Sequence, residues 1–406
     1  MTNQTSHNYK KYLSLYLLLL FSMSVCFLYL KHDVGNDSTI SEWLINYSGG
    51  FTKRGLIGQI SIFFSKFFQS ELRDTILYFQ IIIIGVYYLL IFVFLKNLYL
   101  ERIFLLCIFT PIFLLYPVYE IEVLARKEIF IYILFLTHLF ILSSKFKFSN
   151  ISKLIIFTLS VLIWEPVIFF LPMWILIDLA IKNKNNILTN IFKNFIFYLP
   201  GIFICLIYIF NPLTDSEHSK MANVLKNEFN ELCYMSCGLL LSKSTLTQQI
   251  SGNFHAYSFE NILRYVWIMI IGFIPLFFLL KYSSFKKENT NYFLITKKIK
   301  ITNLFFVVLS PVIILFVMGY DWGRWVNISY TMSLLTFLYL FKRKIINIDL
   351  KKIKQNKINL LSFKYFSLIF IIYCFTWSPK TVITGDIGSF PLYRAMYKIY
   401  KTFLVY

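Results

Sequence analysis

"KLIIFTLSVLIWEPVIFFLPMWILIDLAI", residues 153–181, is an apolar run with a Glu-Pro pair near its middle. A helix that crosses a bilayer needs about 20 apolar residues, so the run is long for one crossing and short for two. The residue before a proline is biased away from helical backbone angles, which favours a hairpin turn at Trp164-Glu165-Pro166. A single tilted helix and a re-entrant element are the alternatives.

Comparable apolar runs recur along the whole chain, which has 406 residues and is 58% hydrophobic. A bilayer core cannot hydrate open backbone groups, and the alternating pattern of a membrane β-barrel is absent. We therefore predict an all-α, polytopic integral membrane protein with about 10–11 transmembrane helices, forming a single domain over residues 1–406. The first run, 12–30, follows Lys10 and Lys11 and precedes no small-residue cleavage site, so we expect a retained signal anchor.

The basic residues decide between the hairpin and the tilted helix. With the hairpin, the inner segments hold 24 Lys+Arg and 4 Asp+Glu, and the outer segments hold 16 of each, which accounts for the chain's 40 and 20. Lysine in short loops favours the cytoplasm, so we expect a cytoplasmic N-terminus and a C-terminus outside. The outer face then carries loops 31–74 and 211–260 and a short tail, 378–406.

The first outer loop contains "NYSGGFTKRG", residues 46–55. Gly49 and Gly50 permit a tight backbone approach, and the stretch from Leu56 has the pattern of an amphipathic helix on a membrane surface. Amide groups at a helix start, beside Lys53 and Arg54, suit a phosphate or pyrophosphate. An ordinary turn whose cations contact lipid headgroups is the alternative.

Two further outer segments, 119–128 and 320–325, combine cations with carboxylates. In "YEIEVLARKE", residues 119–128, Glu120 and Arg126 are candidate site residues, although Glu122 and Arg126 also have the spacing of a simple helical ion pair. A third polar feature is Glu165, because an ionisable side chain within apolar sequence is costly unless it has a partner or a wet cavity.

The segment "YDWGRW", residues 320–325, places Asp321 three residues before Arg324 at the expected mouth of a helix. Trp322 and Trp325 flank this pair, and tryptophan both stacks on sugar rings and populates membrane interfaces. One interpretation is a functional site, in which the Asp321–Arg324 pair acts on a substrate and the tryptophan rings stack on its sugars. The alternative is structural: Asp321 and Arg324 only neutralise each other, and the tryptophans belong to an aromatic belt at the membrane interface.

Several classes of site are not indicated. No CxxC pair, zinc-spaced cluster, GxxxxGK[ST], GxSxG or HExxH occurs, so we expect no metal and no cofactor. The net charge of +20 resides mostly in short segments between apolar runs, which excludes a nucleic-acid partner. We expect His138 to be a packed core residue, and Cys233 and Cys237 to be free thiols on one helix face rather than a disulfide.

"GGFTKRGLIG" and "DWGRW" resemble glycine-arginine and aspartate-arginine patterns of bacterial surface-polysaccharide enzymes. The chain is most similar to O-antigen polymerases of the Wzy type, and more distantly to lipid-dependent C-type glycosyltransferases, over most of its length. The resemblance implies a multi-pass protein of the bacterial inner membrane whose substrate is an undecaprenyl-pyrophosphate-linked glycan. It also implies membrane lipids as surroundings, and a chain-length regulator and a flippase of the same pathway as partners.

On this resemblance, the enzyme joins lipid-linked repeat units at the outer face of the membrane. Cations would stabilise the leaving pyrophosphate and a carboxylate would accept a proton, the candidates for that role being Asp321, Glu165, Glu120 and Asp37. The alternatives are a glycosyltransferase with a polyprenyl-phosphate sugar donor, and a flippase or transporter of lipid-linked glycans. A reaction between two lipids further predicts that Arg54 and Arg324 line one cavity, with Glu165 or Glu120 in its wall.

Overall fold

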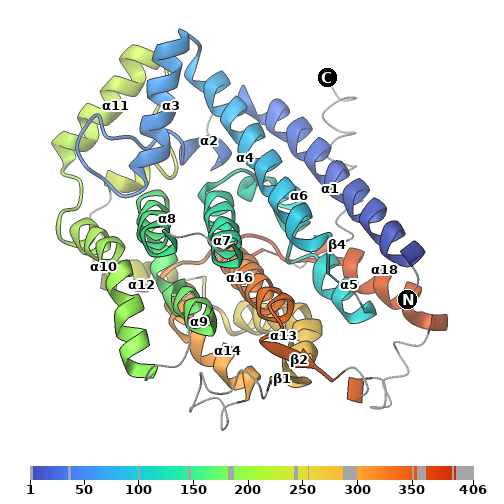
Figure 1. Cartoon of the computed structure of the whole chain (residues 1–406). Helices are drawn as coiled ribbons and strands as arrows, with labels where there is room; N and C mark the ends of the chain where they lie inside the picture. The colour runs from blue at the N-terminus through green and yellow to red at the C-terminus, as the bar shows by residue number, and fades with distance from the viewer. Residues whose placement is uncertain are drawn as a thin grey trace.

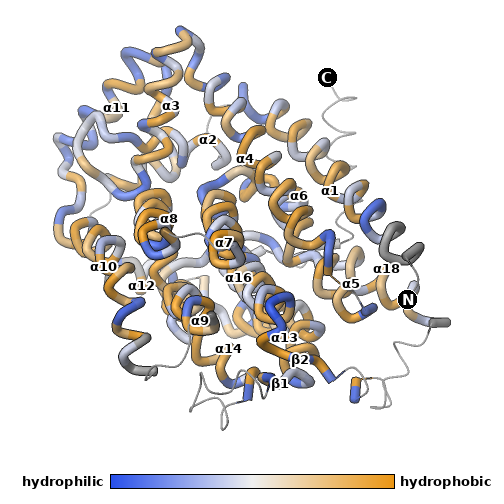
Figure 2. The backbone as a smooth tube through the Cα atoms, in the orientation of Figure 1, coloured by the Kyte–Doolittle hydropathy of each residue, from blue (hydrophilic) through white to orange (hydrophobic). Residues whose placement is uncertain are grey.

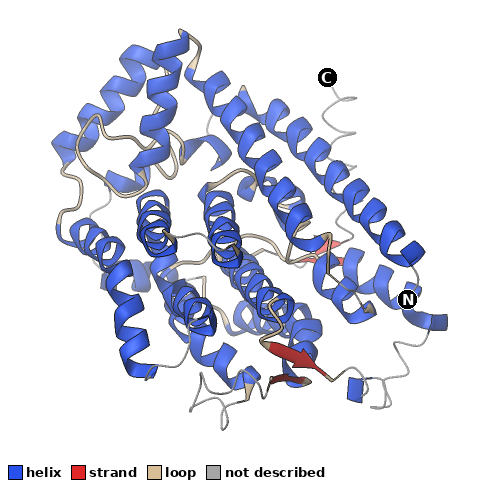
Figure 3. Cartoon of the chain, in the orientation of Figure 1, coloured by secondary structure: helices blue, strands red, loops and turns tan. Residues whose placement is uncertain are grey.

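The computed structural model describes residues 3–34, 38–98, 101–144, 148–181, 187–241, 246–254, 256–286, 300–349, 352–353, 363–385 and 388–389. The chain is 77% helical, which confirms the all-α class, and Figure 3 shows helices packed along nearly its whole length. The few strands form two short antiparallel ladders. These pair β1 (Ser283–Phe285) with β2 (Ile346–Ile348), and β3 (Trp377–Ser378) with β4 (Gly388–Ser389).

The N-terminal half begins with a long helix and ends with the predicted hairpin (Figure 1). Its helices are α1 (Asn3–His32), α2 (Ser38–Ser41), α3 (Gly55–Phe68), α4 (Leu72–Leu95), α5 (Arg102–Phe109), α6 (Tyr116–Tyr119), η1 (Ile121–Val123), α7 (Lys127–Ser143), α8 (Ser149–Ile163), η2 (Glu165–Phe170) and α9 (Leu171–Ile181), where η marks a 3-10 helix.

The C-terminal half alternates long apolar helices with short connecting ones. Its helices are α10 (Ile187–Phe210), α11 (Asp215–Phe229), η3 (Gly238–Leu241), α12 (Leu246–Phe254), α13 (Phe259–Lys281), α14 (Ile301–Leu309), η5 (Ser310–Val312), α15 (Ile313–Met318), α16 (Trp322–Lys342) and α18 (Phe363–Phe375).

Five segments of the described chain are long and apolar enough to cross a membrane, and Figure 2 shows apolar residues covering them. They are Tyr9–His32, Leu72–Leu95, Ile191–Phe210, Phe259–Lys281 and Ile301–Met318. Shorter apolar helices occupy Gly55–Phe68, Ser149–Ile163 and Tyr365–Phe375. The structure thus has the apolar helices of a membrane protein, while the predicted number of 10–11 crossings and their orientation remain predictions.

Helix α16 lies at the centre of the bundle, and every residue from Trp322 to Leu340 is buried. Its polar side chains satisfy backbone carbonyls where the chain leaves α5: Asn327 Nδ2 donates to Ile112 O at 2.8 Å, and Tyr330 Oη donates to Cys107 O at 2.8 Å. Irregular backbone is tolerated deep in an apolar bundle only when such partners exist. Helix α16 therefore stabilises the break between α5 and α6.

Contacts between the two arms confirm the predicted turn at Trp164-Glu165-Pro166, while two membrane crossings remain a prediction. Phe157 on α8 meets Trp174 on α9 with ring centroids 5.5 Å apart, and Lys153 Nζ lies 2.9 Å from Asp178 Oδ2. Both pairs are symmetric about the turn, as antiparallel arms require. The helix breaks at Trp164, whose extended backbone angles (φ −154°, ψ 98°) precede the Glu-Pro pair.

A buried polar cluster centred on Asp178 joins α7, α8, α9 and α10. Besides Lys153, the Asp178 carboxylate meets His138 Nε2 at 3.3 Å and accepts a hydrogen bond from Tyr198 Oη at 2.7 Å. His138 is buried and also contacts Trp174, so it is a packed core histidine as expected. The cluster ties both hairpin arms to their neighbours.

Helix α11 and the turn after it, residues 215–241, form a small cap beside α3, and Figure 1 shows α11 and α3 lying together. Lys66 Nζ on α3 lies 2.6 Å from Glu228 Oε2 on α11, and Arg73 pairs with Glu231 just after α11. The expectation of free thiols in this segment is wrong, because Cys233 and Cys237 form a disulfide. A turn, not a helix, connects them, so the four-residue spacing brings the sulfur atoms together.

Replacing Asp178 tests whether the buried Lys153–Asp178 pair stabilises the hairpin. We expect Asp178→Asn to lower the free energy of unfolding by about 3–5 kcal/mol, because Lys153 would lose its buried partner. Thermal unfolding of the detergent-solubilised protein measures this change. Asp349→Asn, at an exposed Asp–Lys pair, is the control and should cost less than about 1 kcal/mol. If both substitutions lower the free energy of unfolding by the same small amount, the Lys153–Asp178 pair does not stabilise the hairpin.

Candidate functional site

A polar cavity of about 350 Å³ lies where segments distant in the sequence meet. Its wall holds four basic side chains and one carboxylate, namely Lys53, Arg54, Arg126, Arg324 and Asp321. The remaining wall residues are Ile45, Ser236, Leu239, Leu240, Asn253, Met318, Gly319 and Tyr320. The prediction that Arg54 and Arg324 line one cavity is therefore confirmed, while the location of this cavity at the outer face remains a prediction.

The close packing of α3 against the preceding strand-like segment places Arg54 in this wall. A Cβ atom at Gly58 would lie 2.0 Å from the carbonyl oxygen of Ile45, so only glycine allows this approach. Arg54 immediately precedes the helix with a left-handed backbone (φ 63°), which is unfavourable for a residue with a side chain. Such a conformation persists when its surroundings fix it, and here Lys127 Nζ donates to Arg54 O at 2.5 Å.

The turn of the hairpin holds the Arg54 side chain. Arg54 Nε donates to Glu165 Oε2 at 2.9 Å, and Arg54 Nη2 donates to Glu165 Oε1 at 2.9 Å. This paired geometry uses the planar guanidinium fork, which lysine lacks. Glu165 therefore stands behind Arg54 as its support, with both carboxylate oxygens occupied.

Glu42 is the carboxylate at the centre of the arginines, and its side chain is fully buried. It accepts a hydrogen bond from Arg126 Nη2, and its Oε1 lies 3.7 Å from both Arg324 Nη2 and Arg54 Nη1. Burial disfavours the charged form, but the charges of Arg126, Arg324 and Arg54 outweigh it and hold the pKa of Glu42 below its ordinary value. Glu42 is thus an ionised, permanently paired group.

Arg324 is fixed from two sides at the mouth of α16. Its Nη1 donates to Asp321 Oδ2 at 2.5 Å, and its Nη2 donates to Glu128 Oε1. The Asp321–Arg324 pair expected from the three-residue spacing is therefore present, and the Asp321 side chain is itself partly exposed.

The charges of the site nearly balance. The four basic wall residues and Lys127 face the carboxylates of Glu42, Glu128, Glu165 and Asp321, which leaves one net positive charge. Because each arginine is already ordered by a carboxylate, little reorganisation is needed when an anion binds. The site offers fixed hydrogen-bond donors rather than a large excess of charge.

Four buried polar atoms of this cluster have no hydrogen-bond partner within the described chain: Glu42 Oε2, Glu128 Oε2, Arg126 Nε and Arg324 Nε. Buried polar groups are paired in the great majority of cases, with protein or with water. Two of the four belong to arginines that line the cavity. These atoms mark the cavity as a place for a polar ligand or ordered water.

The predicted glycines and tryptophans have packing roles in the structure. A Cβ atom at Gly49 would lie 2.0 Å from the backbone oxygen of Glu217, so the glycines allow the cap to dock and do not line the cavity. Trp322 and Trp325 are buried, with Trp322 among Tyr257, Tyr265 and Phe316. Gly50 likewise faces the Glu217 side chain.

Neither Glu165 nor Glu120 is part of the cavity wall, so the prediction that one of them lines it is wrong. Glu120 Oε1 lies 3.4 Å from Lys380 Nζ, in a neighbouring pair. Asp37 lies outside the described residues. No group of three or more metal-ligating His, Cys, Asp or Glu side chains occurs in the part of the chain that the structure describes.

The helical ion pair considered for Glu122 and Arg126 is wrong. The chain forms a single 3-10 turn, η1, and then a left-handed residue at Ala125 (φ 56°), so Arg126 points to Glu42 instead. The local sequence pattern does not mark Glu42, Lys127 and Glu128 as site residues. Their pairings join residues 73 or more positions apart, and local spacing gives no signal for them.

Acidification tests the role of Glu42. Its folded pKa lies below the unfolded value of 4.5, so its stabilisation is complete above that pH and is lost as the pH falls further. We expect Glu42→Gln to lower the free energy of unfolding by about 3–5 kcal/mol at pH 7, and the gap to the wild type to narrow below pH 4.5. Thermal unfolding between pH 7 and pH 3.5 measures the gap, with the exposed Glu122→Gln as control; a gap independent of pH would contradict the pairing.

Comparisons of the chain with protein-family models, with curated proteins and with solved structures find no match.

Proposed function

We propose that the chain is a membrane-embedded glycan polymerase that acts on undecaprenyl-pyrophosphate-linked oligosaccharides at the outer face of the bacterial inner membrane. The observation that carries this proposal is the cavity walled by Lys53, Arg54, Arg126 and Arg324. Guanidinium groups bind phosphate oxygens through paired hydrogen bonds, and here they are held in place beforehand. The family resemblance of the two motifs supplies the substrate class.

In the proposed reaction, the hydroxyl of an acceptor repeat unit attacks the anomeric carbon of the donor glycan. The bond from that carbon to the pyrophosphate oxygen breaks, and the electron pair leaves with the pyrophosphate. Arg54, Arg126 and Arg324 stabilise the charge that develops there. Asp321 accepts the hydroxyl proton, since it is the carboxylate in the cavity wall and is partly exposed.

An apolar groove of about 680 Å³ supports a lipid-linked substrate. It lies among α13, α14, α15 and α16, and its lining is almost entirely aliphatic and aromatic. Phe316 in the groove and Met318 in the cavity wall lie two positions apart on α15. A polyprenyl chain in the groove would therefore place its pyrophosphate near the arginines.

The disulfide supports the proposed orientation. Disulfides persist in oxidising compartments and are rare in the cytoplasm. Ser236, between Cys233 and Cys237, lies in the cavity wall, so the cavity and the disulfide share one face. The same face is the outer one by the distribution of lysine and arginine.

A flippase or transporter of lipid-linked glycans is the second candidate. The buried Asp178, Lys153 and His138 cluster favours it, because ionisable groups among apolar helices mark ion or proton pathways in transporters. A glycosyltransferase with a polyprenyl-phosphate donor would use the same cations. A deletion strain separates the main candidates: surface lipid carrying one repeat unit supports the polymerase, and loss of the exported unit supports the flippase.

Substitution of the arginines tests the pyrophosphate site. We expect Arg54→Lys and Arg324→Lys to reduce long-chain glycan in a complemented deletion strain about 100-fold, nearly as much as the alanine variants, because lysine cannot form the fork. Gel analysis of surface glycan, at matched protein levels, measures the effect. Arg343→Lys, at the other end of α16, is the matched control. Full activity of both lysine variants would show that the guanidinium groups of Arg54 and Arg324 have no role in the reaction.

Epitope labelling of spheroplasts, whose outer membrane has been opened, tests the orientation. Epitopes inserted at Glu217 and Thr381 should react in spheroplasts, and epitopes at Ser149 and Lys352 should react only after the inner membrane is permeabilised. The expectation follows from the asymmetry of the basic segments. An accessible epitope at Lys352 in sealed spheroplasts would place the cavity on the cytoplasmic face.

A further inference from the structure

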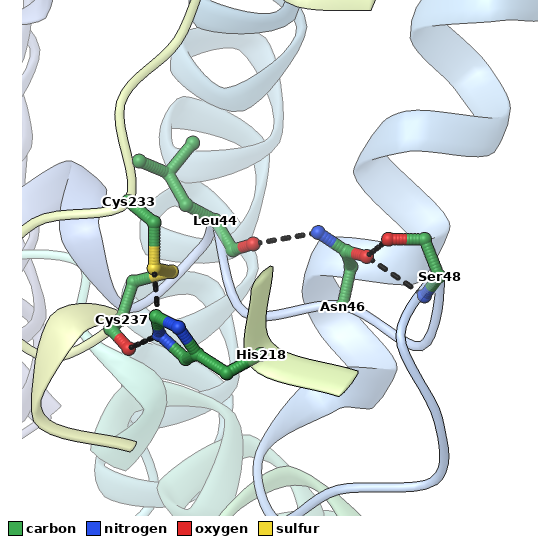
Figure 4. The surroundings of a disulfide bond; sticks show 6 residues. All are labelled: Leu44, Asn46, Ser48, His218, Cys233 and Cys237. Atoms are coloured by element: carbon green, nitrogen blue, oxygen red, sulfur yellow. Dashed lines mark hydrogen bonds between the residues drawn. A yellow bond between two sulfur atoms is a disulfide. The ribbon is translucent and has the colours of Figure 1, made fainter. Parts of the chain in front are cut away.

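The disulfide encloses a turn that forms part of the cavity wall. Ser236 lies within the turn, and Leu239 and Leu240 follow it in η3; all three line the cavity together with the arginines. Figure 4 shows the sulfur bridge above His218, with the loop at Leu44, Asn46 and Ser48 alongside. The cap therefore contributes a wall element whose position depends on this turn.

The turn has an unfavourable backbone conformation. Met235, between the two cysteines, has a left-handed backbone with φ 43°. For an L-residue other than glycine, this conformation lowers the population of the turn by about tenfold. A covalent link across the turn offsets that preference by excluding extended conformations of residues 233–237.

The cap anchors the turn from its other side. His218 on α11 is buried, and its Nε2 lies 3.2 Å from Cys237 O and 3.4 Å from Cys233 Sγ. Helix α11 is in turn held on α3 by the Lys66–Glu228 ion pair, and on the loop before α3 by the close approach at Gly49. The Cys233–Cys237 bond closes this turn and is the only disulfide within the described chain.

We propose that Cys233 and Cys237 are positioning residues: their disulfide holds Ser236, Leu239 and Leu240 in the cavity wall, and anion binding by the arginines depends on it. The inference rests on the proposed pyrophosphate site. The wall excludes water from one side of the guanidinium groups, and a charge pair is stronger where water is excluded. The Ser236 hydroxyl adds a hydrogen-bond donor.

Reduction reverses the restraint. A dithiol such as dithiothreitol supplies two electrons and two protons, which convert the disulfide into two thiols while the reagent forms its own cyclic disulfide. Met235 then relaxes from the left-handed region, and the wall residues leave the cavity. The chain thus binds anions tightly only in an oxidising compartment.

The test uses the full chain in nanodiscs and inorganic pyrophosphate as the probe, with Kd measured by calorimetry. We expect Cys233→Ser/Cys237→Ser, and reduction of the wild type, to raise Kd about tenfold. Adding Met235→Gly to the double variant should restore Kd to within about threefold of the wild type, because glycine adopts the left-handed turn without the penalty. Cys26→Ser, at a free cysteine in α1, is the matched control and should leave Kd unchanged.

A second measurement separates turn opening from general unfolding. Hydrogen exchange should accelerate in residues 233–241 of the double variant and remain unchanged in α16. If Arg54→Ala abolishes pyrophosphate binding while the cysteine variant and reduction leave Kd and exchange unchanged, the positioning role is overturned and the proposed function stands. If the wild type does not bind pyrophosphate, both are overturned. Loss of binding without rescue by Met235→Gly overturns the backbone argument.

Discussion

One buried carboxylate organises the site. Glu42 is surrounded by Arg54, Arg126 and Arg324, and a charge removed from water must be paired or it destabilises the fold. Those arginines come from the start of α3, the start of α7 and the start of α16, so the need to pair one charge brings three helix ends together. Glu165 then pairs with Arg54, and Glu128 pairs with Arg324, so both guanidinium groups are held in place.

This arrangement separates two demands on the arginines. Their carboxylate partners satisfy part of each guanidinium and set its direction, while the faces toward the cavity remain open to a ligand. A cluster of unpaired arginines would bind anions more strongly but would repel itself and destabilise the fold. Pairing with carboxylates therefore orders the arginine side chains and lowers the net positive charge of the cavity. A lower net charge binds an anion less tightly, which suits a ligand that must also be released.

The sequence predicted those parts of the fold that depend on apolar length and on the placement of charge. The hairpin followed from a proline and a glutamate within an overlong apolar run, and the convergence of Arg54 and Arg324 followed from placing both on one face. The partners of the arginines could not be predicted, because Glu42 and Arg126 are brought together by the packing of whole helices. The spacing of Cys233 and Cys237 fits both a helix face and a turn, and only the backbone between them decides.

The Lys153–Asp178 pair has a consequence for how the chain enters a membrane. Each arm of the hairpin is short and carries one ionisable group that would be unpaired in lipid if the arm inserted alone. Paired across the hairpin, the two charges are largely neutralised, and the turn keeps them at equal depth. The two arms therefore bury their charges only as a pair, and His138 of α7 and Tyr198 of α10 complete the cluster around Asp178.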